Sequence, residues 1–493
     1  MKLTAVRPES CRGKDSDREP AAAVRSAGTG AVLATACLAA LCSCSTSGPT
    51  QSLSRIAPVP TTWQQGEKNP GPLDTAALPT WWTRFNDPVL NQLITGALHA
   101  SPDVRSALSR ITEYRARRGL ERAALLPSLD AGVSGNRTRS ADHDTHLTTT
   151  SEAYAAALDA SWQVDLFGRQ SQLLTAAAAD LAQREENYHG ALVSLAAEVA
   201  SAYITLRSTE AQLAVVQHSL DTRRETVQLT QWREQAGTGN GLDTQQSVTA
   251  LELAQATIPS LQLMLVQTRN QLALLSGLAP GALDPLLAAP GAVPAAPPDI
   301  AVGIPAEVLR QRPDVRAAER GLEAAFARTQ SARRQRLPSF ALSGSIGVEA
   351  LRLGRLFNPT ATIVSVLGSL TAPVFDAGRV RQTITIQGEL EKQSLATYES
   401  TVLTALGEVE NALVAVQRNS ERMEILARAT TAARAAAQLA GLQYQAGQAD
   451  LLVSLDAQRT LLDLEQQAVT TAANRADASV QLYKSLGGGW SAP

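Results

Sequence analysis

The chain has 493 residues, enough for two to four ordinary domains, and its 44 basic and 46 acidic side chains leave a formal net charge of −2. This balance provides no electrostatic basis for binding nucleic acid or an acidic surface. Aromatic residues make up only 4% of the chain, whereas a catalytic domain of this length usually has a larger aromatic core. Ala, Leu, Val and Gln dominate long stretches, which is typical of long helices packed through small side chains.

The N-terminus has the features of a secretory signal. Basic side chains are concentrated in residues 1–25, and residues 27–42 are apolar and uncharged. The apolar segment is too short for a convincing membrane span. All cysteines lie in this N-terminal region, so we expect no disulfide and no thiolate metal site in the rest of the chain. The four are Cys11, Cys37, Cys42 and Cys44.

Residues 41–44 read LCSC and resemble a bacterial lipobox. The resemblance implies a signal peptide at 1–43, cleavage before Cys44, lipidation of that cysteine and a lipidated segment at 44–85. Several acyl chains together make a stable anchor, because each buried CH₂ contributes about 0.8 kcal/mol. Cleavage before Cys42 is the weaker alternative.

The body of the chain contains the same structural unit twice. Five short runs recur in the same order at an offset of 210 or 211 residues, beginning with SPDVR at 101–105 and RPDVR at 312–316. Six prolines at 280–298, between the units, exclude a helix there and indicate a linker. The predicted organisation is a first repeat at 86–276, a linker at 277–305, a second repeat at 306–486 and a C-terminal tail at 487–493.

Each repeat is predicted to begin with a helix that is followed by two strands. In the first repeat the helix spans 88–122, with Pro102 as a break point near its start. Beyond it, apolar and polar residues alternate with a period of two, which is the pattern of a strand with one apolar face. The predicted strands are 128–138, 153–166, 339–349 and 361–375.

Each repeat then ends in a long helical hairpin. Apolar residues recur every seven positions from Leu192 to Val227, and again from Val402 to Met423, which indicates coiled-coil packing. A helix of roughly 65 residues spans about 100 Å. A free-standing cytoplasmic coiled coil is the alternative, but it explains neither the strands nor the signal. The predicted helices are 168–236, 243–276, 378–446 and 452–486.

The four predicted strands have the length needed to cross a bilayer at a tilt. Four strands cannot close a barrel around a useful lumen, and unpaired strand edges are not tolerated in lipid. The pattern therefore requires several copies of the chain to form one barrel.

Four sequence runs resemble the TolC/OprM-like outer-membrane efflux channel lipoproteins of the NodT type. Together they span essentially residues 78–489. The resemblance implies a mixed α/β membrane protein whose homotrimer forms a 12-stranded barrel and a 12-helix periplasmic tunnel, with the linker wrapped around the waist of the tunnel. The runs are LPTWWTRFNDPVL at 78–90, SWQVDLFGR at 161–169, PVFDAGR at 373–379 and LDAQR at 455–459.

The same resemblance implies the function of a passive outer-membrane exit duct for drugs or other small toxic solutes. A periplasmic adaptor protein would dock on the helix tips, and an inner-membrane pump of the RND type would load the duct. Two alternatives remain open: the outer-membrane component of a type I-like protein or peptide secretion system, and an envelope scaffold that transports nothing.

The turns between the long helices are candidate gate elements. Gly237 and Gly447 supply the left-handed conformation that ends a helix. Asp243 and Asp450 lie near the start of the following helices, where the helix dipole favours a carboxylate. Capping alone explains these two carboxylates, and as a hypothesis we also assign them to a periplasmic gate.

The family resemblance adds further gate residues by position. It implies that Tyr444, Asp456 and Asp243 line the constriction and tie neighbouring helices together. A three-fold ring of Asp456 would attract cations and repel anions. Ala449 and Val453 stand where some members have an Arg and a second Asp, so the salt-bridge details of the gate differ here.

The sequence contains no nucleophile elbow, Walker loop or zinc signature. His143 and His146 have a ligand-like spacing, but a solvated loop between two strands explains them fully. We therefore predict no enzymatic activity, no metal, and no cofactor other than the covalent lipid on Cys44.

Overall fold

The computed structural model describes residues 59–64, 77–141, 148–297, 300, 302–358 and 362–490. They belong to one compact unit that spans residues 57–493. The predicted signal peptide, Cys44 and the His143–His146 pair lie outside the described residues.

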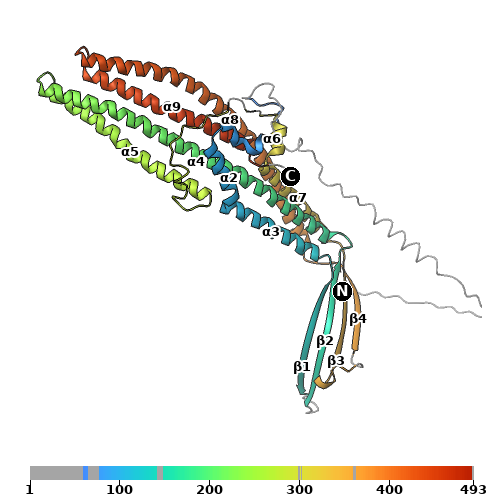
Figure 1. Ribbon diagram of the computed structural model, residues 1–493. Helices are drawn as coiled ribbons and strands as arrows, with labels where there is room; N and C mark the ends of the chain where they lie inside the picture. Colours follow the sequence, from blue (N-terminus) through green and yellow to red (C-terminus); the bar gives the residue numbers. More distant parts are fainter. Residues whose placement is uncertain are drawn as a thin grey trace, which may run out of the picture. The chain divides into compact units, whose positions relative to one another are not determined.

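The two repeats contain matching elements in the same order (Figure 1). The first helix of each long hairpin has 67 residues and the second has 35, which confirms the duplication. The first repeat comprises η2 (Leu78–Phe85), α2 (Pro88–Ala100), α3 (Pro102–Ala123), β1 (Ser128–Ala141), β2 (Thr148–Val164), α4 (Arg169–Gln235) and α5 (Gly241–Leu275). The second comprises α6 (Pro305–Gln311), α7 (Pro313–Arg334), β3 (Ser339–Ala350), η3 (Leu353–Arg355), β4 (Thr362–Thr371), α8 (Arg379–Gln445) and α9 (Leu451–Ser485).

The predicted helix 88–122 is two helices that meet at Ser101. Pro102 has no N–H to continue the ladder of α2, and it stands at the first position of α3, where that N–H is not needed. The Ser101 hydroxyl accepts a hydrogen bond from the backbone N–H of Asp103 at 3.3 Å and so caps α3.

Two predicted strands end earlier than expected. The strand placed at 153–166 ends at residue 164 because the Asp165 carboxylate caps α4, accepting a hydrogen bond from the backbone N–H of Ser171 at 2.7 Å. The strand placed at 361–375 spans only 362–371, since Pro373 cannot donate to a ladder.

The hairpin between β1 and β2 is longer than predicted. Residues 139–141 and 148–150, expected in a polar loop, continue the antiparallel pairing as far as Ala141 opposite Thr148. Backbone hydrogen bonds form this ladder, so it extends past the point where the apolar alternation ends.

The four strands form one antiparallel sheet in the order β1-β2-β3-β4 (Figure 1). The two repeats therefore join side by side through β2 and β3, leaving β1 and β4 as the edges. Facing positions run straight across the sheet: Ala131, Leu158, Ile346 and Val364 form one such row.

The rows separate the sheet into two faces of different chemistry. The apolar face comprises Leu129, Ala131, Val133, Tyr154, Ala156, Leu158, Ala160, Trp162, Phe340, Leu342, Gly344, Ile346, Val348, Val364, Val366, Gly368 and Leu370. The polar face carries mainly Ser, Thr, Asn, Ala and Gly, with Asp130 directly opposite Asp159. Most large side chains of the apolar face are exposed, among them Val133 at 83% and Val366 at 77%, so no other described part of the chain covers this face.

The main hydrophobic core lies where η2, α2 and the end of α9 pack against α4. Trp81 of η2 is fully buried and stacks on Tyr483 of α9, with ring centroids 5.3 Å apart. Tyr203 and Leu206 of α4 belong to the same core. The short N-terminal helix therefore joins the first repeat to the second.

The linker packs on α4 instead of forming a helix. Leu283 and Leu287 are buried in the core. The Arg207 side chain is only 3% exposed, forms an ion pair with Glu210 at 2.7 Å and donates a hydrogen bond to the carbonyl of Ala289 at 2.8 Å. This contact holds the linker against the middle of the long helix.

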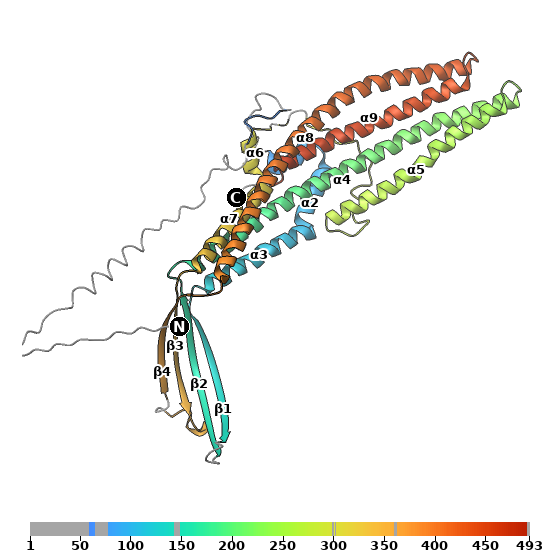
Figure 2. The ribbon, with the colours of Figure 1, turned by 180° about the vertical axis from the view of Figure 1, so that it is seen from behind.

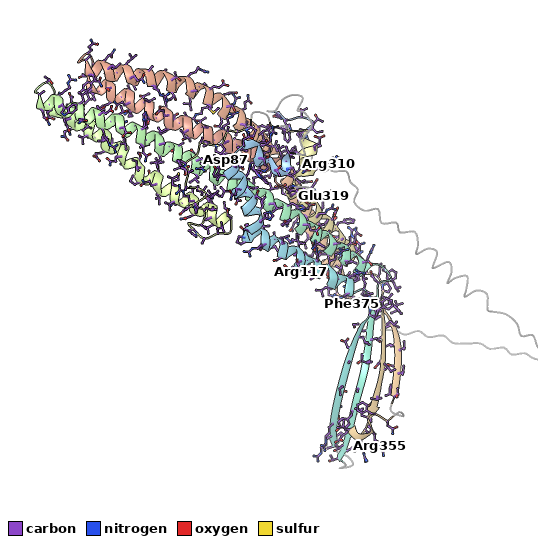
Figure 3. The ribbon with its side chains drawn as sticks, in the orientation of Figure 1. Asp87, Arg117, Arg310, Glu319, Arg355 and Phe375 are labelled. Atoms are coloured by element: carbon purple, nitrogen blue, oxygen red, sulfur yellow. The ribbon has the colours of Figure 1, made fainter. Side chains whose placement is uncertain are left out.

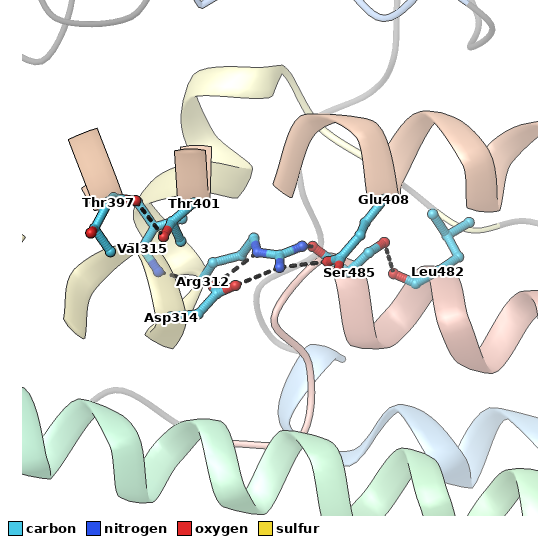
Figure 4. A network of polar contacts seen from close by, with 8 residues as sticks. All are labelled: Arg312, Asp314, Val315, Thr397, Thr401, Glu408, Leu482 and Ser485. Atoms are coloured by element: carbon cyan, nitrogen blue, oxygen red, sulfur yellow. Dashed lines mark hydrogen bonds and ion pairs between the residues drawn. The ribbon is translucent and has the colours of Figure 1, made fainter. Parts of the chain in front are cut away.

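A second buried arginine joins three helices of the second repeat (Figure 4). Arg312, between α6 and α7, forms ion pairs with Asp314 and with Glu408 of α8, both at 2.6 Å. It also donates a hydrogen bond to the backbone carbonyl of Ser485 at the end of α9, at 2.9 Å. The neighbouring carboxylates raise the pKa of Arg312 against the opposing effect of burial.

The long helices form two hairpins, α4 with α5 and α8 with α9, which lie at the opposite end of this unit from the sheet in both views (Figures 1 and 2). Among the described helices, α4 alone is long and apolar enough to cross a membrane by length and composition. Its apolar window is 56% buried inside the protein, as expected of a core helix.

The glycines that end the helices provide a matched test of packing. Gly237 and Gly277 both have positive φ, +71° and +69°, but a Cβ at Gly237 would meet nothing within 4 Å, whereas one at Gly277 would approach the carbonyl oxygen of Ala100 to 2.6 Å. Gly237→Ala should destabilise the protein by about 1 kcal/mol, and Gly277→Ala by about 3 kcal/mol or more, because backbone atoms must also move. Urea midpoints of the two variants would measure the difference, and equal midpoints would contradict this packing.

Candidate functional site

The turns that connect the long helices have the same geometry in both repeats. After α4, the N–H of Thr238 donates to the carbonyl of Arg233 at 2.8 Å, and Gly237 has φ +71°. After α8, the N–H of Gln448 donates to Gln443 at 2.8 Å, and Gly447 also has φ +71°. These bonds satisfy the last carbonyls of each helix and give both hairpins a tight tip.

The two tips are tied to each other through Tyr444, at the end of α8. Its side chain is buried, and the Arg233 guanidinium of α4 lies 4.8 Å from the centre of its ring. Arg233 also donates a hydrogen bond to the Tyr444 carbonyl at 3.1 Å. Burial raises the pKa of Tyr444; the Asp243 carboxylate acts in the same direction, and the Arg233 cation opposes both.

Arg233 is the functional candidate that sequence reasoning missed. It was hidden because it pairs with a residue 211 positions away and belongs to no run shared by the repeats. One signal in the sequence could have found it. At the repeat offset of 210 residues, Tyr444 corresponds to Glu234, and Arg233 is the residue next to Glu234.

The predicted gate carboxylates occupy different surroundings. Asp243 lies in the first turn of α5 and is near enough to influence Tyr444. Asp450 is the N-cap residue of α9, although its side chain makes no capping hydrogen bond. Asp456 is separate from the tie: its side chain is 69% exposed and lies 3.4 Å from that of Arg459. The structure therefore brings Tyr444 and Asp243 together with Arg233, and it leaves Asp456 on an open helix face.

A groove of about 670 Å³ runs between the two hairpins, just behind the tips. It is lined by α4, α8 and α9 and includes Tyr444 and the exposed ring of Trp232. Arg434 and Glu465 form an ion pair at 2.7 Å along the same groove. Its walls are helical, and its lining mixes polar and apolar side chains.

The polar face of the sheet is the second candidate region. Asp130 and Asp159 face each other across β1 and β2, and the row continues through Ser345 and Ser365. Like charges at facing positions repel each other and destabilise the pairing of the strands. Among the described residues, no three His, Cys, Asp or Glu side chains are grouped closely enough to hold a metal ion.

The arrangement of hairpins and sheet matches known outer-membrane proteins. The toluene efflux pump outer membrane protein TtgF of Pseudomonas putida is 32% identical over 456 residues, covering 88% of this chain and 92% of that protein. The pyoverdine export outer membrane protein OpmQ, also of Pseudomonas putida, is 32% identical over 462 residues, covering 92% and 96%.

Solved structures and a family model agree with these relatives. The outer-membrane channel OprN has a TM-score of 0.80 at 33% identity, covering 88% of this chain and 99% of that one. The family model described as outer membrane efflux protein matches residues 93–278 and again 304–488, which are the two repeats. The resemblance noted in the sequence is thereby confirmed, and the chain belongs to the outer membrane efflux protein family.

Proposed function

We propose that this protein is the outer-membrane exit duct of a tripartite efflux system and that solutes pass through it without covalent chemistry. The observation that carries the proposal is the sheet, with one apolar face, one polar face and two open edges. Open edges leave backbone groups unpaired, which is not tolerated in lipid, so β1 of one copy has to pair with β4 of another. Three copies supply twelve strands, enough for a closed barrel with a polar lumen.

The lumen of this barrel continues into the helices. β2 leads into α4 and β4 leads into α8 through short connections, so each barrel segment carries a pair of helical hairpins away from the membrane. The tunnel that they enclose in the trimer ends at the tips, where the Arg233–Tyr444 contact holds α4 and α8 together. We assign the closed gate to this contact, with Asp243, Asp450 and Asp456 making the throat negative.

A periplasmic adaptor protein is the partner that fits the groove beside Trp232. Its docking between α4 and α8 would compete with the tie at the tips, and so would favour the open tunnel. An inner-membrane pump of the RND type then loads the duct. One relative is named for toluene and another for pyoverdine, so we place solute selection in the pump and expect drugs or small toxic solutes as cargo.

Location in the outer membrane follows from the same proposal, and the lipid anchor on Cys44 is its second attachment. Intact mass of the N-terminal peptide tests the anchor: a peptide that begins at Cys44 and carries acyl chains is expected. An unmodified Cys44 would remove the anchor from the proposal and leave the barrel unaffected.

The proposal as a whole is tested on the detergent-purified, full-length protein. Native mass spectrometry should find a trimer, and the protein in planar lipid bilayers should produce ion-conducting steps. A monomer, or a trimer that never conducts after the tips are opened by substitution, would overturn the duct in favour of an envelope scaffold.

The polar face predicts the ion preference of the barrel. In a closed barrel, Asp130 and Asp159 of every copy would form one ring of carboxylates at a single level of the lumen. The variant Asp130→Asn/Asp159→Asn should shift the reversal potential under a salt gradient away from cation preference. Asp456→Asn tests the ring at the tips separately, and an unchanged potential in the strand variant would assign the selectivity to the tips alone.

A further inference from the structure

The end of the sheet farthest from the helices carries an arginine surface, made of Arg137, Arg139, Arg352 and Arg355. Arg137 and Arg139 are the continuation of the apolar face of β1, in positions that follow Leu129, Ala131 and Val133 with the same alternation. Arg352 and Arg355 lie in the turn between β3 and β4, and Figure 3 places Arg355 at the far end of the sheet.

In the register of the strands, these arginines lie just beyond the row of facing residues that contains Tyr154. Gly135, Tyr154 and Ala350 face one another in that row, and Arg137 faces Glu152 in the next row on the same face. Arg352 is two residues beyond Ala350 and so follows the row on the β3 side. Glu152 lies 3.5 Å from Arg137, which leaves an excess of positive charge on this surface.

Exposed apolar side chains accompany the arginines in the same turn. Leu351 is 73% exposed, Leu353 is 63% exposed and Phe357 is 84% exposed. If this turn were surrounded by water, three exposed apolar side chains beside two arginines would add nothing to its stability. A membrane interface accommodates both, because apolar groups enter the acyl region while guanidinium groups remain at the headgroups.

The distance along β2 fits the thickness of a membrane. Tyr154, within β2, and Trp162, near its end, both lie on the apolar face. The stretch that they bound, 154–162, is close to the roughly 9–11 residues that a tilted strand needs to cross a membrane. Apolar bands of outer-membrane barrels are about 25 Å tall and are bordered by aromatic residues. The arginine surface therefore lies just outside the apolar band, at headgroup level.

We propose that this arginine surface binds the phosphate groups of lipopolysaccharide, the phosphorylated glycolipid of the outer leaflet. The inference rests on the proposed function, because the duct orientation sends the helices into the periplasm and the opposite end of the sheet to the cell exterior. The surface is continuous with the lipid-facing side of the barrel, its charge is complementary to phosphate, and arginine binds phosphate oxygens in a bidentate manner.

Binding is tested with the full-length protein and purified lipopolysaccharide, using native mass spectrometry to count retained glycolipid. Arg137→Gln/Arg139→Gln and Arg352→Gln/Arg355→Gln should each weaken binding about tenfold or more, since every arginine near an anionic surface contributes about a fivefold factor. Arg115→Gln/Arg418→Gln, which removes two exposed helix arginines, is the matched control and should bind as the parent does.

The lipid source is decided by two further probes. Dephosphorylated lipopolysaccharide should bind as weakly as the glutamine variants do. Equal retention of phosphatidylglycerol and lipopolysaccharide would overturn the assignment to the glycolipid, and unchanged binding in both glutamine variants would overturn the arginine surface itself.

A second measurement is independent of binding affinity. All cysteines lie at or before position 44, so Phe357→Cys introduces a single cysteine into the body of the protein for an environment-sensitive fluorophore. In lipopolysaccharide-containing vesicles the label should shift to the emission of an apolar surrounding. Leu242, at a helix tip, is 65% exposed, so a label on Leu242→Cys should show the emission of an aqueous surrounding. The same aqueous emission from the label at position 357 would contradict membrane contact.

Failure of this inference can be separated from failure of the duct. Trimer mass and bilayer conductance are measured on the same variants. Conducting trimers that do not bind lipopolysaccharide would overturn only the proposal of the arginine surface. The absence of conducting trimers in the parent protein would overturn both the duct and this inference.

Discussion

Replacing Arg233 with alanine is expected to raise the single-channel conductance of the assembled protein several-fold. The guanidinium lies over the ring of Tyr444 and donates to its carbonyl, so it contacts both the side chain and the backbone at the end of α8. Within the described residues these contacts join the two hairpin tips directly, and the turns themselves hold each hairpin only to itself. Alanine removes both contacts, and the equilibrium shifts toward separated tips.

The ring of Tyr444 provides the second half of the test. Tyr444→Leu keeps an apolar side chain and the backbone carbonyl that accepts from Arg233 but removes the aromatic face, so its conductance should rise by less than that of Arg233→Ala. Because Arg233→Ala already removes the contact with the ring, the double variant should add little to Arg233→Ala alone. Arg224→Ala, which disrupts an exposed ion pair with Asp221 on the same helix, should conduct like the parent protein.

A closed-state conductance that stays unchanged in both single variants would show that other residues hold the tips. The hydrogen bond from the Gln458 side chain of α9 to the Thr226 hydroxyl of α4, at 3.2 Å, would then be the next candidate. Additive effects of the two substitutions would assign Arg233 and Tyr444 to separate contacts, contrary to the geometry.

Replacing Arg312 with alanine is expected to lower the free energy of unfolding by about 3 kcal/mol. The side chain is 7% exposed and pairs with Asp314 and Glu408, and its removal also leaves the Ser485 carbonyl without this donor. As Figure 4 shows, these partners come from three different helices, so the loss affects the joint between α7, α8 and α9. The carboxylates of Asp314 and Glu408 are about half exposed, so hydration by water compensates for part of the lost ion-pair stabilisation.

Arg312→Lys distinguishes charge from geometry. Lysine keeps the cation but cannot present the planar fork that reaches two carboxylates and a carbonyl together, so an intermediate loss is expected. Urea unfolding followed by circular dichroism measures both variants. Arg418→Ala, which removes an exposed pair with Glu421, should change stability by less than about 0.5 kcal/mol. A loss of the same size in Arg312→Ala would mean that the joint is held by apolar packing alone.

The sequence by itself determined the elements and their duplication. Period-two alternation predicted four strands, and the heptad from Leu192 to Val227 predicted the helix that is now α4. These predictions succeeded because periodicity and glycine caps are local properties, readable from residues a few positions apart. The errors occurred at boundaries, such as the end of β2, where the side chain of Asp165 captures backbone N–H groups instead of letting the strand continue.

The tertiary structure alone decided which distant residues meet. It set the register that places Asp130 opposite Asp159, and it brought Arg233 to Tyr444 and Arg312 to Glu408. No local pattern carries this information, because each contact depends on how two long helices or two strands align over their whole length. The same is true of the arginine surface: the order of residues in β1 was readable, but only pairing with β2 and β3 showed that its charges follow the apolar face past Tyr154.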